Sequence, residues 1–456
     1  RACRDVQVND VLGMSGRGAN SYPVFDMNNL MGESSCVGCG ECVQACPTGA
    51  LIETSLLDKN NDQTIFPEKQ IKSLCPFCGV GCQTLVSVKD NKIVAVDGQN
   101  GPANENRLCV KGRFGFDYIN SPQRLTTPLI RISKKTKSWD ISIDNQDIYK
   151  YFRKASWEEA LDFASNRFTK ILKSNNKNSL AGFGSAKGSN EEAYIFQKLI
   201  RTGFKTNNVD HCTRLCHASS VAALLQSVGS AAVSAPFTTV KDSECIILIG
   251  ARPEQNHPVA ASYFKQAVKN GTKLIILDPR KQSLSRYATH HLQFNPGQDL
   301  ALLNAMIFTI IDENLINKEY IENHTEGFKQ LEKEIKKFDP ALMEKLCGIP
   351  KEIIREVAKI YAKAKTSIIF WGMGISQHIH GTQNAFSLIN LSLITGHLGK
   401  SGTGLHPLRG QNNVQGASDA GLIPMSFPDY NSVKIKTNNE KMQKFWNSSL
   451  DLNEGK

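Results

Sequence analysis

Cysteine is the residue type that most clearly marks candidate chemistry in this sequence. The chain of 456 residues contains 13 cysteines, and nine of them precede residue 110. Most of these nine are separated by only two or three residues. Such crowding is typical of metal binding, since closely spaced thiolates can surround one centre, whereas disulfide frameworks belong mainly to short secreted chains. We therefore predict that the N-terminal part of the chain binds metal.

The stretch CVGCGECVQACP places Cys36, Cys39, Cys42 and Cys46 directly ahead of a proline. This is the spacing of bacterial ferredoxins, in which the first three thiolates hold one 4Fe–4S cluster and the fourth holds a different cluster. A zinc ribbon would need two separated pairs of cysteines instead. The stretch therefore predicts ligands for iron–sulfur clusters.

Crossed ligation of this kind leaves each cluster in need of ligands from elsewhere. Cys3 is the only cysteine upstream of Cys36, so we expect it to complete the cluster of the first three thiolates. Cys46 should then serve a cluster whose other ligands are not in this sequence. We therefore expect the chain to begin inside a two-cluster ferredoxin module.

A second cysteine group consists of Cys75, Cys78 and Cys82 in CPFCGVGC, followed by Cys109 in NRLCVKG after 26 intervening residues. Four thiolates are the usual ligand set of a further 4Fe–4S cluster. Spacing alone leaves a zinc site open as the alternative.

A third group lies in the stretch HCTRLCH, which contains His211, Cys212, Cys216 and His217. It could be a zinc site, half of a redox pair, or one metal ligand beside a residue that takes part in the chemistry. The following SSVAALLQSVG predicts a helix capped by Ser219 or Ser220, which places Cys216 just before the helix N-terminus. The helix dipole there favours the thiolate that a metal requires.

The elements expected to position these residues alternate in type. The apolar runs ECIILIG, KLIILDPR and SIIFWGMG alternate with the helical patterns HPVAASYFKQAVKNG and TQNAFSLINLSLITGHLG, and LAGFGSA precedes NEEAYIFQKLIRTG. This alternation predicts βαβ units and a mostly parallel sheet. TLVSVKDNKIVAVDG predicts two strands around a tight Asp90–Asn91 turn. SWEEALDFASNRFTKIL predicts a helix with Ser156 as its N-cap.

The sequence divides into three expected domains of an α/β protein. Residues 1–57 form an incomplete ferredoxin-like 4Fe–4S module, and residues 58–70 read as a polar linker. Residues 71–125 form a small β-rich 4Fe–4S domain. Residues 126–456 form an α/β region with mostly parallel sheets, which includes a charged, irregular stretch at about 131–153.

Composition narrows the possible partners. Hydrophobic residues make up 40% and charged residues 21%, as in globular proteins that dissolve in water. The net charge is +11, but basic residues cluster only in KKTK (134–137), so we do not predict nucleic-acid binding. The charge could instead balance anionic cofactors. No apolar run is long enough to predict a membrane span.

The sequence resembles a known family at several motifs. The C-x2-C-x3-C pattern, the long gap and GPANENRLCVKG resemble the molybdopterin oxidoreductases of the dimethyl sulfoxide reductase superfamily. NNVDHCTRLCHASSVAAL, NHPVAA, LDPR, WGMGISQHIHGT and LHPLRGQNNVQGASDAG resemble the catalytic (alpha) subunit of formate dehydrogenases. The resemblance implies an enzyme that oxidises formate to CO2 at a molybdenum or tungsten bis-molybdopterin guanine dinucleotide, with electron transfer through 4Fe–4S clusters.

The resemblance also implies roles for individual residues. Cys216 would ligate the metal, and His217 would handle the proton because imidazole can titrate near neutral pH. Arg409 would orient formate, since a guanidinium can form two parallel hydrogen bonds with a carboxylate. Lys111 would lie between a cluster and a pterin. Gln411 and Asn412 are weaker candidates for the wall of the substrate pocket beside Arg409. His211 and Cys212 would be structural neighbours of Cys216.

The nucleotide parts of this cofactor are expected at the strand ends, where open α/β sheets bind ligands. The expected contacts are Gly250, Asn256, His257, Asp278, Arg280, Pro296, Gly297, Asp299, Gly374 and Gln377. Cys245 and Cys347 are interpreted as buried structural cysteines.

The resemblance further implies a cytoplasmic protein with an electron-accepting partner subunit linked to NAD, ferredoxin or a hydrogenase. Family members continue into a C-terminal domain that helps to hold one dinucleotide, so we expect the sequence to be truncated at both ends. One alternative is a nitrate reductase of the same superfamily. Another is a metal-free electron-transfer subunit like the large cluster-bearing subunit of respiratory complex I, which would lack counterparts of Cys216 and Arg409.

Overall fold

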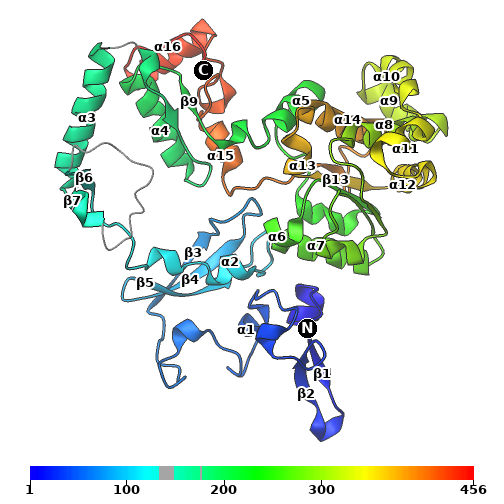
Figure 1. Cartoon of the computed structure of the whole chain (residues 1–456), viewed down its shortest axis with the longest axis horizontal. Helices are drawn as coiled ribbons and strands as arrows, with labels where there is room; N and C mark the ends of the chain where they lie inside the picture. The colour runs from blue at the N-terminus through cyan, green and yellow to red at the C-terminus, as the bar shows by residue number, and fades with distance from the viewer. Residues whose placement is uncertain (133–147, 175–176, 456) are drawn as a thin grey trace. The chain divides into compact units, whose positions relative to one another are not determined.

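The computed structural model describes residues 1–132, 148–174 and 177–455, which form two compact units (Figure 1). The first unit comprises Arg1–Phe114 and Cys212–Val414. The second unit comprises Gly115–His211 and Gln415–Lys456. Every residue expected to bind a cofactor, metal or substrate belongs to the first unit.

The cysteine-rich part of the first unit is built from short elements. Its N-terminal elements are the π-helix η1 (Ala2–Val6), the antiparallel hairpin of β1 (Leu12–Ser15) and β2 (Tyr22–Phe25), and the helix α1 (Glu41–Gln44). An antiparallel sheet of β3 (Lys69–Leu74), β4 (Gln83–Lys89) and β5 (Lys92–Gly98) follows, and then the helix α2 (Val110–Phe114). Because these elements are short, most of the cysteines lie in loops between them.

The hairpin of β4 and β5 confirms the predicted tight turn. Asp90 and Asn91 both have positive φ, at 49° and 58°. Aspartate and asparagine tolerate this left-handed conformation, which matches the twist of a two-residue hairpin. The predicted linker is wrong over its last two residues, because Lys69 and Gln70 already pair with β4.

A five-stranded parallel sheet forms the centre of the first unit, in the spatial order β12-β11-β10-β13-β14. The strands are β10 (Cys245–Ile249), β11 (Lys273–Leu277), β12 (His290–Leu292), β13 (Ser367–Trp371) and β14 (Gly404–Pro407). The strand β10 is central, β11 and β12 lie on one side of it, and β13 and β14 lie on the other. This doubly wound arrangement confirms the predicted α/β class with a mostly parallel sheet.

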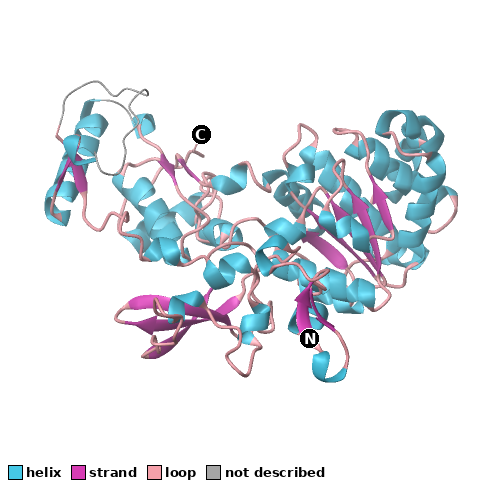
Figure 2. Cartoon of the chain, turned by 60° about the horizontal axis from the view of Figure 1, so that its bottom comes forward, coloured by secondary structure: helices cyan, strands magenta, loops and turns pink. Residues whose placement is uncertain are grey.

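Helices cover both faces of this sheet (Figure 2). Ile247 and Ile369 belong to the core cluster that contains residues of α8 (Asp299–Asp312), α12 (Lys351–Lys363) and α14 (Gly381–Thr395). On the other face, Phe370 meets Phe264 of α7 (Pro258–Lys269) with ring centroids 4.7 Å apart. Since successive strand residues face opposite sides, runs of Ile and Leu without polar interruption suit strands that are covered twice. The helices of this part are α5 (Ala218–Val228), α6 (Pro253–Asn256), α7 (Pro258–Lys269), α8 (Asp299–Asp312), α9 (Lys318–His324), α10 (Phe328–Glu334), α11 (Pro340–Cys347), α12 (Lys351–Lys363), α13 (Met373–Ser376) and α14 (Gly381–Thr395).

The second unit contains two small two-stranded sheets and its own helices. The strands β6 (Leu129–Arg131) and β7 (Phe152–Lys154) pair antiparallel, and β8 (Gly182–Phe183) and β9 (Val209–Asp210) pair parallel. The helices are α3 (Trp157–Ser174), α4 (Asn190–Gly203), α15 (Val414–Asp419, from the last residue of the first unit) and α16 (Lys436–Trp446). The prediction of an irregular stretch at about 131–153 is wrong at its two ends, because Arg131 belongs to β6 and Phe152 and Arg153 belong to β7. The basic cluster KKTK (134–137) lies outside the described residues.

Capping confirms two helix starts that the sequence predicts in the second unit. The Ser156 hydroxyl accepts a hydrogen bond from the N–H of Glu159 at 3.1 Å, which caps α3. Ser189 and Glu192 form a reciprocal capping box at the start of α4. Of the described helices, none combines the length and the apolar character needed to span a membrane.

Candidate functional site

The sheet of the first unit has its topological switch point between β10 and β13. Gly250 follows β10, and Gly372 and Gly374 follow β13. The N–H of Gly374 donates to the carbonyl oxygen of Gly250 at 3.0 Å, and a Cβ added to Gly374 would lie 2.7 Å from the Cα of Gly250. Glycine is therefore needed here, because it lets the two loops approach closely at the strand ends, where sheets of this topology bind ligands.

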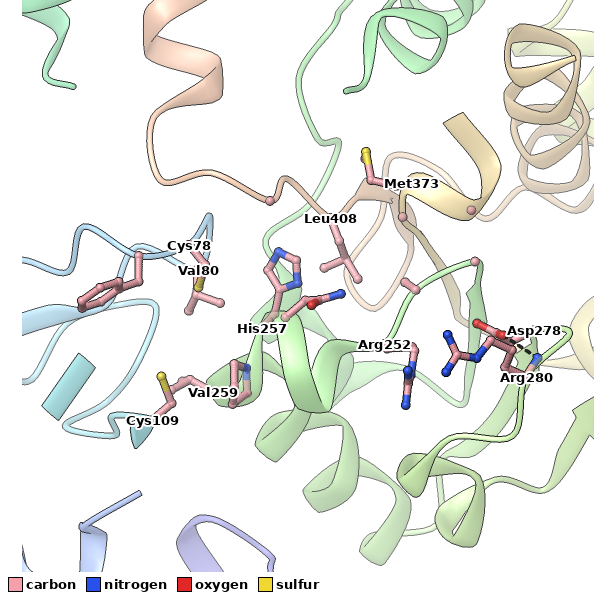
Figure 3. A pocket seen from close by; sticks show the side chains of 18 of the residues that line it. Cys78, Val80, Cys109, Arg252, His257, Val259, Asp278, Arg280, Met373 and Leu408 are labelled. Carbon is pink, nitrogen blue, oxygen red and sulfur yellow. Dashed lines mark hydrogen bonds between the residues drawn. The ribbon is translucent and has the colours of Figure 1, made fainter. Parts of the chain in front are cut away.

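A cavity of about 560 Å³ opens at this switch point (Figure 3). Nine of the ten residues expected to contact a dinucleotide line it, from Gly250 to Gly374, and the exception is Gln377. Lys111 and the cysteines Cys75, Cys78, Cys82 and Cys109 line the same cavity from the other side. The Gln377 amide instead donates to the carbonyl oxygen of Leu215. Gln411 and Asn412 are also absent from the lining.

The part of the cavity near β10 and β11 carries positive charge. Arg252, Asp278 and Arg280 gather there, and the N–H of Arg280 donates to the Asp278 carboxylate at 2.8 Å (Figure 3). The Arg252 Nε is buried and makes no hydrogen bond to any described residue. A buried guanidinium N–H without an acceptor, in a cavity that is also lined by glycines, fits an anionic group such as a phosphate of a nucleotide. The sequence reasoning missed Arg252, although its position after the β10 strand was a usable signal.

The thiols of the second cysteine group lie within electrostatic reach of one another. The pKa of Cys82 is raised by burial and by the charges of Cys75, Cys78 and Cys109. Within the described parts of the chain, no three His, Cys, Asp or Glu side chains come close enough to share a single metal ion. Four thiols within electrostatic reach of one another are the usual ligand set of a 4Fe–4S cluster.

The first cysteine group shows the same relationship and includes Cys3. Burial, together with charges that include Cys42 and Cys3, raises the pKa of Cys39 to about 11. Burial, Cys36 and Cys3 raise the pKa of Cys42. Cys46 instead lies 3.5 Å from the Thr48 hydroxyl, which lowers its pKa to about 7 together with nearby backbone N–H groups. Cys3 therefore lies within electrostatic reach of Cys39 and Cys42, whereas the groups that shift the pKa of Cys46 are its own neighbours Thr48, Ala50 and Leu51.

Cys216 lies immediately before the N-cap of α5. The N-cap is His217, so the prediction of a Ser219 or Ser220 cap is wrong; both serines instead bond to Ser376. The Cys216 sulfur lies 3.5 Å from the sulfur of Met373. Its pKa is raised, because burial and Cys212 outweigh the stabilising effects of Arg409 and the Gly410 N–H. The expected preference for the thiolate is therefore absent from the metal-free thiol.

His217 is fully buried and hydrogen-bonded on both ring nitrogens. Nε2 lies 3.1 Å from the carbonyl oxygen of Leu408, and Nδ1 lies 3.1 Å from the Ser376 hydroxyl. Burial, followed by the charge of Arg409, lowers its pKa to about 3. In the metal-free chain the ring is therefore neutral and donates from Nε2 to the Leu408 carbonyl oxygen, and its role in handling the proton stays a prediction.

Arg409 is held in place through its own backbone and side chain. The neutral ring of His257 donates from Nε2 to the Arg409 carbonyl oxygen at 2.6 Å, and the Arg409 guanidinium donates to the Ala231 carbonyl oxygen at 2.7 Å. A Cβ at Gly79 would overlap the Arg409 carbonyl, so the loop of the second cysteine group packs directly on this backbone. The charge of Arg409 acts on Cys216 and His217, which places the three side chains in one region.

The remaining members of the HCTRLCH stretch have partners of their own. The His211 ring lies 3.1 Å from the Ser418 hydroxyl within the second unit. The Cys212 sulfur contacts the side-chain oxygen of Gln411. Neither joins Cys216 in a ligand group among the described residues.

Three models of known protein families match parts of the chain. A family model described as molybdopterin oxidoreductase matches residues 124–452. A model described as the molybdopterin oxidoreductase Fe4S4 domain matches residues 68–121, and a 4Fe–4S binding domain model matches residues 32–52.

Several curated proteins are similar in sequence. A formate dehydrogenase alpha subunit of Methanocaldococcus jannaschii is 39% identical over 85% of this chain and 54% of its own length. Formate dehydrogenase H of Escherichia coli is 38% identical over 83% of this chain and 52% of its own length. A putative formate dehydrogenase of Staphylococcus aureus is 33% identical over 100% of this chain and 48% of its own length. The chain thus spans about half the length of the curated relatives it matches.

Among solved structures, acetylene hydratase from Pelobacter acetylenicus has a TM-score of 0.62. The identity is 24%, over 72% of this chain and 43% of that chain. This likeness concerns the fold.

Proposed function

Because this chain belongs to the molybdopterin oxidoreductase family, we propose that it is part of the catalytic subunit of a formate dehydrogenase, which oxidises formate to CO2. The observation that carries the proposal is the convergence of Cys216 and Arg409. Nearly two hundred residues separate them, yet the guanidinium charge acts on the thiol, and the thiol accepts from the N–H of Gly410.

We propose that Cys216 ligates a molybdenum or tungsten ion held by two molybdopterin guanine dinucleotides. One of the dinucleotides would bind at the switch point. Arg252 and Arg280 offer cationic hydrogen-bond donors there, and the glycines have no side chain that would keep a ligand away from the backbone. When bound, this group would accept the two electrons of formate.

The residues of the chain itself would bind and orient the substrate. The Arg409 guanidinium would neutralise and align the formate carboxylate. His257 would fix the backbone carbonyl of Arg409, and His217 would fix that of Leu408, so the loop holds one position. Burial keeps both imidazoles neutral, and in each ring the Nε2–H group donates a hydrogen bond to the carbonyl oxygen. We accordingly propose His217 as a positioning residue of the loop.

Two groups of thiolates are suited to hold successive 4Fe–4S clusters. The group of Cys75, Cys78, Cys82 and Cys109 lines the dinucleotide cavity. The group of Cys3, Cys36, Cys39 and Cys42 lies beyond it, and Lys111 lines both this cavity and a second cavity that Cys39 and Cys109 share. This order suits electron transfer toward a partner subunit, which could be linked to NAD, ferredoxin or a hydrogenase.

Substitution of Arg409 in the full-length protein tests the proposal. Loss of a charge-assisted partner of a buried carboxylate costs about 2–5 kcal/mol, so Arg409→Ala should lower kcat/KM for formate roughly 30- to several thousand-fold. Arg409→Lys keeps the charge but not the two parallel donors, and should recover only part of the loss. Dye reduction by formate is the assay, with metal and iron contents as controls. Normal formate oxidation by Arg409→Ala, or activity of the wild type with nitrate in place of formate, would refute the assignment.

A further inference from the structure

Lys265 of α7 is a buried cation. The residue is 8% exposed, and its ammonium donates a hydrogen bond to the Asn9 side-chain oxygen at 2.7 Å. The ring of Tyr287 lies 6.0 Å from the Nζ, and Arg286 is a nearby like charge. Within the described ranges, no carboxylate pairs with this ammonium, and Asp10 raises its pKa less than Cys39 and Cys3 do.

A buried ammonium is costly unless an opposite charge lies close by. Lys265 lines a cavity of about 480 Å³ together with Cys39 of the first cysteine group and Cys109 of the second. Lys111 and Arg286 also line it, together with the carboxylate of Glu254, so its lining carries more positive than negative charge. Burial and Arg286 lower the pKa of Lys265 to about 8, whereas thiolate charge at Cys39 and Cys3 raises it. Cys39 and Cys3 thus raise the pKa of Lys265 more than Asp10 does, and Cys39 lines the same cavity as Lys265.

Contacts from α7 explain why Lys265 faces this group. Asn9, which accepts from Lys265, donates its backbone N–H to the Cys3 carbonyl oxygen at 2.9 Å. One residue along the helix, Gln266 donates to the Asp5 carbonyl oxygen at 2.6 Å. One turn further, Lys269 donates to the Arg4 carbonyl oxygen at 3.1 Å. One face of α7 therefore holds the η1 segment that carries Cys3.

We propose that Lys265 is the counter-cation of the 4Fe–4S cluster of Cys3, Cys36, Cys39 and Cys42, and that its charge raises the reduction potential of this cluster. The inference rests on the cluster assignment made under the proposed function. Reduction adds one electron to the cluster and transfers no atom, and formate supplies the electrons as it is converted to CO2, one proton and two electrons. A fixed positive charge in a poorly solvated site favours the more negative, reduced state. The catalytic α/β part of the chain would thereby set the potential of a cluster held by the N-terminal module.

Matched substitutions on α7 test this role. Lys265→Met removes the buried charge and keeps much of the side-chain volume. Lys269→Met makes the same chemical change one turn away, at a side chain that is 42% exposed and pairs with Asp10 at 3.2 Å. Lys265→Arg retains the charge. Each full-length variant is titrated with dithionite at pH 7 while the reduced clusters are followed by EPR.

The equilibrium constant for one-electron reduction of the cluster should fall at least tenfold in Lys265→Met, which corresponds to about 59 mV toward negative potential. It should stay near the wild-type value in Lys265→Arg and Lys269→Met. An unchanged potential in Lys265→Met, or an equal shift in Lys269→Met, overturns the inference.

Iron content separates the remaining outcomes. If Lys265→Met loses the cluster and Lys265→Arg retains it, the counter-cation role is supported, because the two replacements differ in charge. If both variants lose it while Lys269→Met keeps it, the inference is overturned, because shape and not charge then matters. A wild-type protein without this cluster's EPR signal contradicts the cluster assignment itself, whereas a normal signal with an unshifted potential contradicts only the role of Lys265.

Discussion

The Nε of Arg113 donates a hydrogen bond to the carbonyl oxygen of Cys39 at 2.9 Å, although 74 positions separate the two residues. The backbone N–H of the same arginine donates to the carbonyl oxygen of Cys109 at 3.0 Å. One residue therefore binds the backbone of a cysteine from each of the first two groups. Its guanidinium is fully buried and pairs with Asp97 at 2.9 Å and Glu41 at 3.5 Å.

Replacement of Arg113 by methionine should strongly destabilise the cysteine-rich part of the chain. The buried Glu41 carboxylate would lose its ion pair, and the Cys39 carbonyl would lose its donor. Breaking one side of a buried ion pair costs about 3–5 kcal/mol, so the free energy of unfolding should fall by that amount in urea denaturation. Arg167→Met, at an exposed position of α3, is the control and should cost less than about 0.5 kcal/mol. Equal stability of the two variants would show that the buried network contributes little.

Cys3 should be required for the cluster of the first cysteine group. Cys3→Ser replaces a thiolate with a poor ligand, so the full-length protein should lose roughly four iron atoms and the EPR signal of one 4Fe–4S cluster. Cys347→Ala is the control, because this cysteine is fully buried in the core beside α8 and α12, among apolar residues. Iron analysis and EPR provide the measurements. Full iron content in Cys3→Ser would mean that another residue completes the cluster.

His257 should act on catalysis through the backbone of Arg409. His257→Ala removes the donor to the Arg409 carbonyl, and loss of a buried hydrogen-bond partner costs about 1–3 kcal/mol. If the loop shifts, kcat/KM for formate should fall roughly 5- to 150-fold while metal and iron contents are retained. His257→Gln keeps a side-chain N–H donor and should recover part of the activity. Wild-type kinetics in His257→Ala would exclude this positioning role.

The strand and helix pattern could be predicted largely from the sequence, because buried parallel strands and their helices leave strong apolar periods. ECIILIG and SIIFWGMG became β10 and β13, and NEEAYIFQKLIRTG became α4. The strand β14 was missed, since its four residues, Gly404–Pro407, include a glycine, a histidine and a proline. Its burial comes from pairing with β13, which no local pattern reveals.

The site was predictable where chemistry follows strand ends or ligand spacing, and much less so where it depends on burial. Gly250 and Asp278 line the cavity as expected, since both follow a strand. The neutral state of His217 could not be predicted, because it arises from enclosure by residues as distant in sequence as Leu408 and Ser376. Lys265 lies in an ordinary amphipathic helical pattern, and only the folded chain reveals that its charge is buried beside cysteines.

Acid should destabilise the first unit through His397, which lies between α14 and β14. Its side chain is buried, and Nε2 lies 3.2 Å from the Tyr361 carbonyl oxygen. Burial lowers its pKa to about 4, whereas a histidine in an unfolded chain titrates near about 6.5. Between these values the unfolded state binds more protons, so stability rises with pH across this window and is lost as pH falls through it.

The full effect of His397 is at most about 3.5 kcal/mol, since each of the roughly 2.5 pKa units corresponds to about 1.4 kcal/mol. His397→Phe removes the titrating group and keeps a ring beside Tyr361, whose own ring centroid lies 5.1 Å from that of the histidine. Urea denaturation at a series of pH values from 4 to 7 is the measurement, and the difference between wild type and variant isolates this residue from the carboxyl groups that titrate in both. The wild type should lose stability more steeply than the variant as pH falls. Parallel curves would mean that His397 becomes protonated without unfolding, which its position against the Tyr361 carbonyl and the apolar core argues against.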